Sequence, residues 1–199
     1  MKIEAKLKAM GLTLPPVPAA VASYIPFVQV ANLLFLAGTT GEQDGKSPYA
    51  GRVGAEVTLE QAREAARRCG LNHLAMMRAA LGDLDRVERI VRLIGYVHSA
   101  PGFTDQPAVI NGESDLYIAL WGEQGRHARA ALGGGPFYAN APVETEVIVQ
   151  VKAAQAVPRG VAVARAVGEA RKAGAGRASA RGAKAAAARR RAASRGRRR

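Results

Sequence analysis

The chain has 199 residues, 48% of them apolar, so it can bury the core of one ordinary domain. The formal charge of +13 is confined to the end of the chain: residues 1–158 hold 15 basic and 15 acidic residues, whereas residues 159–199 hold 14 basic residues and one acidic residue. The single cysteine, Cys69, excludes an intrachain disulfide, and no segment has the roughly 18 uncharged apolar residues that a membrane span requires. A soluble, cytoplasmic protein without membrane contact is expected.

The first 21 residues predict a lead-in to the domain. Residues 3–10 can form one short helix that ends at Gly11, because the prolines in the following LTLPPVP prevent its continuation. This segment begins with alternating charges and contains no unbroken apolar stretch, so a signal peptide is not expected. The domain itself is predicted over residues 22–157.

Two apolar runs open this domain. YIPFVQV (24–30) and LLFLAGTTG (33–41) flank Ala31-Asn32, a spacing typical of a tight hairpin. The following stretch is rich in glycine and polar residues, which favours a loop. The pattern therefore predicts two antiparallel strands and then a loop.

A long helix and a central strand are predicted next. The sequence TLEQ at 58–61 has the form of a capping box, in which the threonine and glutamine side chains each bond a free backbone N–H. Small and apolar residues then recur at helical spacing, Cys69 and His73 among them, until Gly82. VERIVRLIGYVHSA (87–100) is dense in β-branched and aromatic residues, as a central strand requires.

The remaining pattern predicts one more helix and two more strands. Residues 107–124 have helical periodicity that stops at Gly125, and RHARAALG (126–133) and VETEVIVQVKAAQ (143–155) are typical of strands. The predicted class is α/β (α+β), with the element order β-β-α-β-α-β-β. Two long helices can cover one face of a mixed sheet, and self-association would cover the other face.

Residues 158–199 have a different composition from the rest of the chain. Alanine, glycine, arginine and lysine dominate, which predicts a disordered basic tail. Such a tail resembles the arms of histone-like proteins, which bind phosphate backbones nonspecifically. A solvated extension without a nucleic-acid partner is the alternative.

The residues offer little for metal, cofactor or covalent catalysis. His73, His98 and His127 are 25 and 29 residues apart and only one cysteine accompanies them, so neither a metal site nor a cofactor is expected. Cys69 lies within a predicted helix and no Gly-x-Ser-x-Gly sequence occurs, which does not favour a nucleophile. We interpret His127, close to two arginines, as a solvated edge histidine in preference to a catalytic base.

Four stretches between residues 22 and 152 resemble a known family: IPFVQVANLLFLAGTTG, GYVHSAPGFTDQPAVIN, RHARAALGG and NAPVETEVIVQV. Together with the element order, they resemble the RidA (YjgF, endoribonuclease L-PSP/chorismate mutase-like) family, and NAPVE resembles a less-studied branch of it. The resemblance implies a chorismate mutase-like fold and a ring-shaped homotrimer with a pocket at each subunit interface. It also implies hydrolysis of enamines and imines, such as 2-aminoacrylate, to 2-oxo acids and ammonia.

The same resemblance implies roles for individual residues. Arg129 matches the arginine that binds the substrate carboxylate, and Glu144, 15 residues later, matches the glutamate associated with the attacking water. Asn111 matches an asparagine at the pocket rim, and Gly38 matches the glycine whose backbone closes on the substrate. A guanidinium offers a carboxylate a planar fork of donors, and a carboxylate can orient a water and accept its proton.

Some positions depart from the family pattern. Phe27 takes the place of a tyrosine, which keeps the ring wall of the pocket but not the hydroxyl, and Ala131 stands where many members carry cysteine. These departures bear on the substrate more than on the fold. Two alternatives to catalysis of imine hydrolysis therefore stay open: a protein that binds a small carboxylate without turnover, and a nucleic-acid-binding or endoribonuclease activity aided by the tail.

Overall fold

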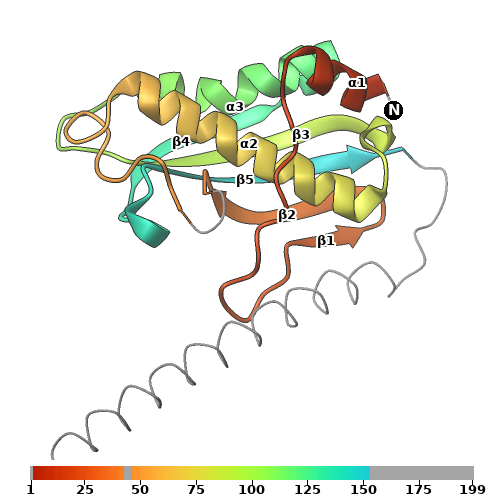
Figure 1. Ribbon diagram of the computed structural model, residues 1–199, viewed down its shortest axis with the longest axis horizontal. Helices are drawn as coiled ribbons and strands as arrows, with labels where there is room; N and C mark the ends of the chain where they lie inside the picture. The colour runs from red at the N-terminus through yellow and green to blue at the C-terminus, as the bar shows by residue number, and fades with distance from the viewer. Residues whose placement is uncertain (1, 43–45, 153–199) are drawn as a thin grey trace, which may run out of the picture. The chain divides into compact units, whose positions relative to one another are not determined.

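The computed structural model describes residues 2–42 and 46–152, so the predicted basic tail (158–199) lies outside the described residues. In chain order the elements are α1 (Lys2–Ala9), β1 (Phe27–Val30), β2 (Leu33–Thr40), α2 (Leu59–Leu81), the 3₁₀ helix η1 (Leu84–Arg86), β3 (Val87–His98), α3 (Gln106–Trp121), the 3₁₀ helix η2 (Gly122–Gly125), β4 (Ala128–Gly134), the 3₁₀ turn η3 (Tyr138–Asn140) and β5 (Val143–Val151). After α1, the strands and long helices follow the predicted order β-β-α-β-α-β-β (Figure 1).

The five strands form one mixed sheet in the spatial order β1-β2-β5-β3-β4. Only β3 and β4 run parallel to each other, and α3 connects them, as a parallel pair requires a crossover. The last strand along the chain, β5, lies in the middle and pairs antiparallel with both β2 and β3. The outermost strands, β1 and β4, are the two edges of the sheet.

Local sequence determines where several elements begin and end. The hairpin between β1 and β2 turns at Ala31, whose φ is 51°. The capping box before α2 is complete, since the Thr58 hydroxyl accepts from the Gln61 backbone N–H and the Gln61 side chain accepts from the Thr58 N–H. The helix ends at Gly82, which takes the left-handed conformation (φ 77°) that glycine adopts without strain.

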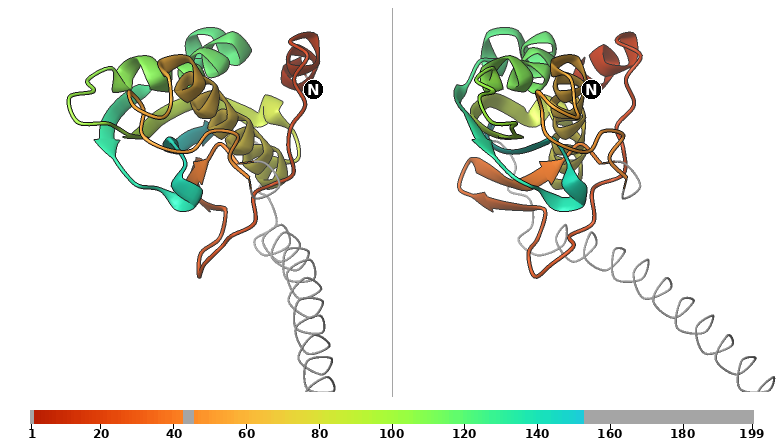
Figure 2. Two further views of the ribbon diagram at one scale, coloured as in Figure 1. Left: turned by 60° about the vertical axis from the view of Figure 1, so that its left-hand side comes forward. Right: turned by 90° about the vertical axis from the view of Figure 1, so that its left-hand side faces the viewer.

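Helices α2 and α3 lie side by side on one face of the sheet, as Figures 1 and 2 show from different directions. They cross closely at Gly112, where a Cβ atom would lie 2.0 Å from the Arg63 carbonyl oxygen. The core fills the space between these helices and the sheet, and each large side chain in it contributes about 1.5–3 kcal/mol on burial. Its largest fully buried apolar members are Tyr117, Leu34, Leu74, Met77, Leu84, Ile90, Leu93, Ile110 and Leu120.

Among the described residues no helix lies on the opposite face of the sheet, which we call the open face. Along β5 the buried residues alternate with half-buried ones, and Glu144, Glu146 and Ile148 belong to the half-buried set that points to the open face. Large apolar side chains are exposed there, with 38% of Phe35 and 48% of Leu132 accessible. Within one chain, a substantial part of this apolar surface is uncovered.

The N-terminal helix α1 is attached to the domain through polar contacts. The Asp85 carboxylate accepts from the backbone N–H groups of Lys2 and Ile3, and the Lys6 ammonium donates to the Leu120 carbonyl at 2.6 Å. Asp85 follows the C-terminal end of α2 and Leu120 lies near the C-terminal end of α3, so these contacts attach the start of the chain to one end of the helix layer. Among the described residues, no helix is long and apolar enough to cross a membrane.

Candidate functional site

Arg129 projects from the edge strand β4 toward the first turns of α3. One terminal nitrogen, Nη1, donates to Asn111 Oδ1 at 2.8 Å and to Ser114 Oγ at 3.0 Å, and Nη2 donates to the Pro107 carbonyl at 3.3 Å. The structure therefore brings together Arg129 and Asn111, two of the residues predicted from the sequence. Ala131 lies two residues further along β4, partly buried on the same side of the sheet.

Ser114 and His127 extend this arrangement into a directed chain of hydrogen bonds. His127 Nδ1 lies 2.7 Å from the Gly125 carbonyl, which can only accept, so Nδ1 carries the proton. Burial, and then the positive charge of Arg129, lower the pKa of His127, which favours the neutral ring. Its Nε2 therefore accepts from the Ser114 hydroxyl at 3.0 Å, which leaves the hydroxyl oxygen to accept from Arg129.

This geometry corrects the interpretation of His127 as a solvated edge histidine. The ring is half-buried, both of its nitrogens are bonded, and it contacts the Tyr117 ring edge-on at 6.1 Å. The interpretation was wrong because neighbouring arginines in the sequence do not indicate which way the ring points. The histidine faces inward, and its Nε2 bonds the Ser114 hydroxyl that also contacts Arg129.

The charge of Arg129 is not neutralised within the described part of the chain. All three of its partners there are neutral oxygens. A guanidinium has five N–H donors, so the three bonds leave two of them for another acceptor. A fixed, uncompensated guanidinium with two available donors suits a carboxylate ligand.

Glu144 and Gly38 form a second cluster, on the open face. A Cβ atom at Gly38 would lie 2.7 Å from Glu144 Oε1, so only glycine allows the backbone of β2 to approach this carboxylate so closely. Burial, and then the charge of Glu146, raise the pKa of Glu144 above its ordinary value of 4.5. A half-buried carboxylate of raised pKa can hold a water and accept its proton.

A β-bulge brings Gly38 to this carboxylate. The pairing of β2 with β5 passes from Leu36↔Val147 directly to Thr39↔Thr145, so that two residues of β2 stand opposite one residue of β5. The two residues of β2 are Ala37 and Gly38, which stand opposite Glu146 of β5. Bulges of this kind turn a strand locally, and here the turn directs the Gly38 backbone toward Glu144.

The two clusters lie on opposite faces of the sheet in one chain. Arg129 is in register with Leu93, which is in register with Val147, and both of these partners are buried beneath the helices. Glu144 is three residues from Val147 along the regular strand β5, so its side chain points to the open face. A single chain therefore does not bring Arg129 and Glu144 together.

Phe27, which is predicted to form a ring wall of the pocket, is largely buried in one chain. It is 7% exposed and belongs to the apolar core, in register with the buried Leu36. Only a small part of its ring is accessible in one chain.

The surface has two hollows, of which one lies on the same face as the Glu144 cluster and the other includes none of the candidate residues. One of about 320 Å³ lies on the open face, lined by Phe35, Leu36, Arg92, Ile94, Glu146, Val147 and Ile148. The Tyr96 hydroxyl donates to Glu146 at 3.0 Å on the same face. The other, of about 390 Å³, lies on the outer surface of α2 and α3 and includes none of the candidate residues.

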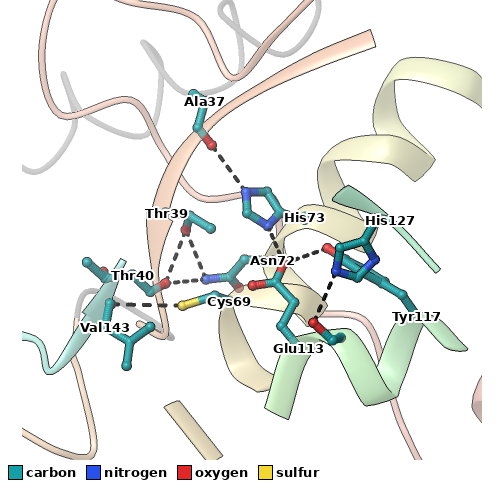
Figure 3. Close-up of polar contacts among 11 residues, drawn as sticks. Ala37, Thr39, Thr40, Cys69, Asn72, His73, Glu113, Tyr117, His127 and Val143 are labelled. Carbon is teal, nitrogen blue, oxygen red and sulfur yellow. Dashed lines mark hydrogen bonds and ion pairs between the residues drawn. The ribbon is translucent and has the colours of Figure 1, made fainter. Parts of the chain in front are cut away.

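A buried polar group between the helices was not identified from the sequence. His73 on α2 and Glu113 on α3 are both fully buried, with Nδ1 and Oε1 2.9 Å apart, and the Tyr117 hydroxyl donates to the same Oε1 at 2.6 Å (Figure 3). The other ring nitrogen of His73 faces the Ala37 carbonyl at 3.3 Å. His73 lies on the predicted apolar stripe of its helix, and no local pattern indicates a carboxylate partner 40 residues away.

Comparison with known proteins agrees with this fold. Residues 4–145 match the family described as "YjgF/chorismate mutase-like, putative endoribonuclease". Protein TCP17 of Trypanosoma cruzi is 38% identical over 151 residues, which are 75% of this chain and 94% of that protein.

Two solved structures are also similar. Protein Atu1372 of Agrobacterium tumefaciens, of unknown function, is 43% identical with a TM-score of 0.70, and the match covers 76% of this chain and 94% of that one. A "putative endoribonuclease" of Shewanella oneidensis is 31% identical with a TM-score of 0.73, over 76% of this chain and all of the other. With its mixed sheet, its two helices on one face and these matches, the chain belongs to the YjgF/RidA family of chorismate mutase-like proteins.

Proposed function

We propose that the protein hydrolyses small 2-imino acids, formed from enamines such as 2-aminoacrylate, to 2-oxo acids and ammonia. The observation that carries the proposal is the Arg129 guanidinium, which neutral oxygens hold in place while two of its donors stay available. A fixed cation of this kind recognises a carboxylate, and every 2-imino acid has one next to its reactive carbon. The resemblance to the RidA family implies the same reaction class.

The reaction requires little beyond orientation of the substrate and a water. The oxygen of the water bonds to the imine carbon as the C=N π electrons move to nitrogen, and Glu144 accepts a proton from the water. The same proton passes to the nitrogen, which gives the carbinolamine. Its hydroxyl proton then moves to the nitrogen through Glu144 as the C–N bond breaks, so that ammonia leaves and the carbonyl of the 2-oxo acid forms. Anchoring by Arg129 holds the imine carbon in place during these steps.

The proposed site is completed between copies of the chain in a homotrimer. The open face exposes Val28, Val30, Phe35 and Leu132, so in one chain it is an apolar surface that needs a cover. Arg129 lies on an edge strand, at the periphery of the sheet, where a second copy can approach it. A neighbouring open face could then supply Glu144 and Gly38 opposite Arg129.

An assay of 2-aminoacrylate generated by a pyridoxal-phosphate-dependent dehydratase tests the proposal. We expect the protein to accelerate the loss of the enamine, and Arg129→Ala to lower kcat/KM by about 100-fold, because the substrate carboxylate loses its charged partner. Arg126→Gln, which changes an exposed arginine paired with Glu123, is the matched control and should leave the rate unchanged.

Either of two results would reject the deaminase proposal. One is no acceleration by the wild-type protein, and the other is equal acceleration by Arg129→Ala. Stabilisation of the inactive protein by a 2-oxo acid in a thermal-shift measurement would then support the alternative of a binding protein without turnover.

A second proposal concerns the basic end of the chain. We propose that residues 159–199, with 14 basic residues against one acidic residue, bind nucleic acid nonspecifically. Deleting this segment should abolish binding to RNA and DNA duplexes, and the intact protein should lose affinity steeply as salt rises. Affinity or RNA cleavage that survives the deletion would assign either property to the domain instead.

A further inference from the structure

We propose that His73, oriented by Glu113, is a positioning residue that holds the Ala37–Gly38 bulge of β2 against the Glu144 carboxylate. The inference rests on the proposed function to the extent that Glu144 holds the attacking water. The role of His73 in fixing the bulge depends only on the contacts of the described residues.

The bulge needs partners that the sheet does not provide. Because Ala37 and Gly38 interrupt the pairing of β2 with β5, their backbone groups leave the regular ladder there. The Ala37 N–H donates to the Pro26 carbonyl at 2.8 Å, and the Ala37 carbonyl faces His73 Nε2 at 3.3 Å. The peptide groups on either side of Ala37 are thus held by one contact from the loop before β1 and one contact from α2.

The neighbouring residue on α2 extends this support to the end of the strand. The side-chain amide of Asn72 donates to the Thr40 carbonyl at 2.9 Å and to the Glu42 carbonyl at 3.1 Å. Figure 3 shows Asn72 and His73 directed toward β2 from the same helix. Two consecutive side chains therefore hold the segment that passes Glu144.

The hydrogen bonds define how many protons the buried pair holds. A carbonyl only accepts, so His73 Nε2 must carry a proton to bond Ala37. Its Nδ1 faces Glu113 Oε1, so a further proton lies between these two atoms, on one or the other. The pair is neutral as a whole in both cases, and Glu113 keeps the Nε2–H directed at Ala37.

Burying His73 and Glu113 costs free energy. We take this cost as an argument that the contact of His73 with the bulge has a function. Two ionisable groups are removed from water, and Glu113 Oε2 has no hydrogen-bond partner among the described residues. Apolar side chains would fill the same space between the helices without that cost. What they could not do is donate a proton to the Ala37 carbonyl.

The proposal is tested by comparing two double variants of the full chain. His73→Leu/Glu113→Leu removes both ionisable groups and the donor to Ala37, so no unpaired ionisable group of the pair stays buried. His73→Gln/Glu113→Gln removes both charges but keeps an amide N–H that can reach the carbonyl. Arg63→Gln, which breaks the exposed pair with Asp115 between the same two helices, is the control for a general loosening of helix packing.

Two readouts separate positioning from stability. By NMR, amide exchange of Ala37 should be about 10-fold faster in the leucine pair and near the wild-type rate in the glutamine pair and in Arg63→Gln. In the imine assay, kcat of the leucine pair should fall about 10-fold while KM stays within about twofold, since Arg129 is untouched. Its acidic pH limb should also move to lower pH, because a looser bulge lets water reach Glu144.

The outcomes distinguish this inference from the proposed function. If the wild-type protein does not hydrolyse imines, the proposed function fails, and Ala37 exchange alone decides whether His73 holds the bulge. Unchanged exchange in the leucine pair overturns the positioning role. Should the leucine pair not fold, the glutamine pair decides in the same assays: exchange and kcat near the wild-type values support the donor role, and losses as large as those expected for the leucine pair overturn it.

Discussion

Charged side chains have different surroundings on the two faces of the sheet. On the helix-covered side, His73 and Glu113 form a neutral buried pair, and the neutral oxygens of Asn111 and Ser114 hold Arg129. On the open face, Glu144 lies close to Glu146 without a cation bonded to either carboxylate among the described residues, next to exposed apolar side chains. On the first side each charged group is held by partners of the same chain, although Arg129 keeps two donors available, whereas the second side offers negative charge and apolar surface to something outside the chain.

This difference indicates which parts of the site a single chain can organise. Arg129 is oriented before any ligand or partner arrives, because α3 provides its partners. Glu144 is also fixed locally, by the bulge at Gly38, but on the wrong side of the sheet to meet Arg129 in the same chain. The rotational symmetry of the proposed homotrimer would solve this problem, since it would place one face of a subunit against a different face of the next.

The sharpest test of the comparison mixes two inactive variants. If Arg129 and Glu144 act from different chains, Arg129→Ala and Glu144→Gln should each be inactive alone. Co-expressed in equal amounts, they should regain roughly a quarter of the wild-type activity, because random assembly leaves that share of interfaces with both groups intact. The specific activity of the purified mixed oligomer measures this recovery.

Recovery depends on association through the open face, which provides the control. Phe35→Glu in both variants should yield monomers by light scattering and abolish the recovered activity, since it places a charge within the exposed apolar surface. No recovery from the mixture, in oligomers shown to contain both variants, would mean that the two groups do not act across an interface.

The helix-covered side is tested by Gly112→Ala. The new Cβ would lie 2.0 Å from the Arg63 carbonyl oxygen, so α2 and α3 must move apart, and the flanking Asn111 and Glu113 move with them. We expect the free energy of unfolding to fall by about 1–3 kcal/mol in urea denaturation. This loss should appear even though alanine favours a helix over glycine by about 1 kcal/mol.

Asp115→Ala is the matched substitution on the same helix. It removes only the exposed ion pair with Arg63, which is worth less than about 1 kcal/mol. Equal stability of the two variants would show that the close crossing at Gly112 contributes nothing to the packing of the helix layer.

Much of the fold could be predicted from the sequence because its signals are local. The capping box at Thr58, the stop at Gly82 and the alternation along β5 each depend on residues within a few positions of one another. Helix α3 ends earlier than predicted, at Trp121, and the 3₁₀ helix η2 continues to Gly125. Periodicity alone does not separate these two helix types.

The site could be predicted only in part, because strand pairing between residues distant in the sequence determines to which face of the sheet a side chain points and which residues it contacts. The interval between Arg129 and Glu144 places both on late strands, but the register through Leu93 decides that they point to opposite faces. The pair of His73 and Glu113 was missed for the same reason, since each residue alone fits an ordinary helix. The proximity of Arg129 to Asn111, in contrast, follows the expectation from the family resemblance.

The pH dependence of activity tests how Glu146 affects the ionisation of Glu144 on the open face. The charge of Glu146 is one of the two causes that raise the pKa of Glu144, after burial. As a base, Glu144 must be ionised, so kcat/KM should rise with pH through this raised pKa. Glu146→Gln removes the repulsion and makes ionisation easier, so the acidic limb should move to lower pH. Glu123→Gln, which changes an exposed carboxylate paired with Arg126, should leave the limb in place. A limb that does not move in Glu146→Gln would show that a group other than Glu144 controls the reaction at low pH.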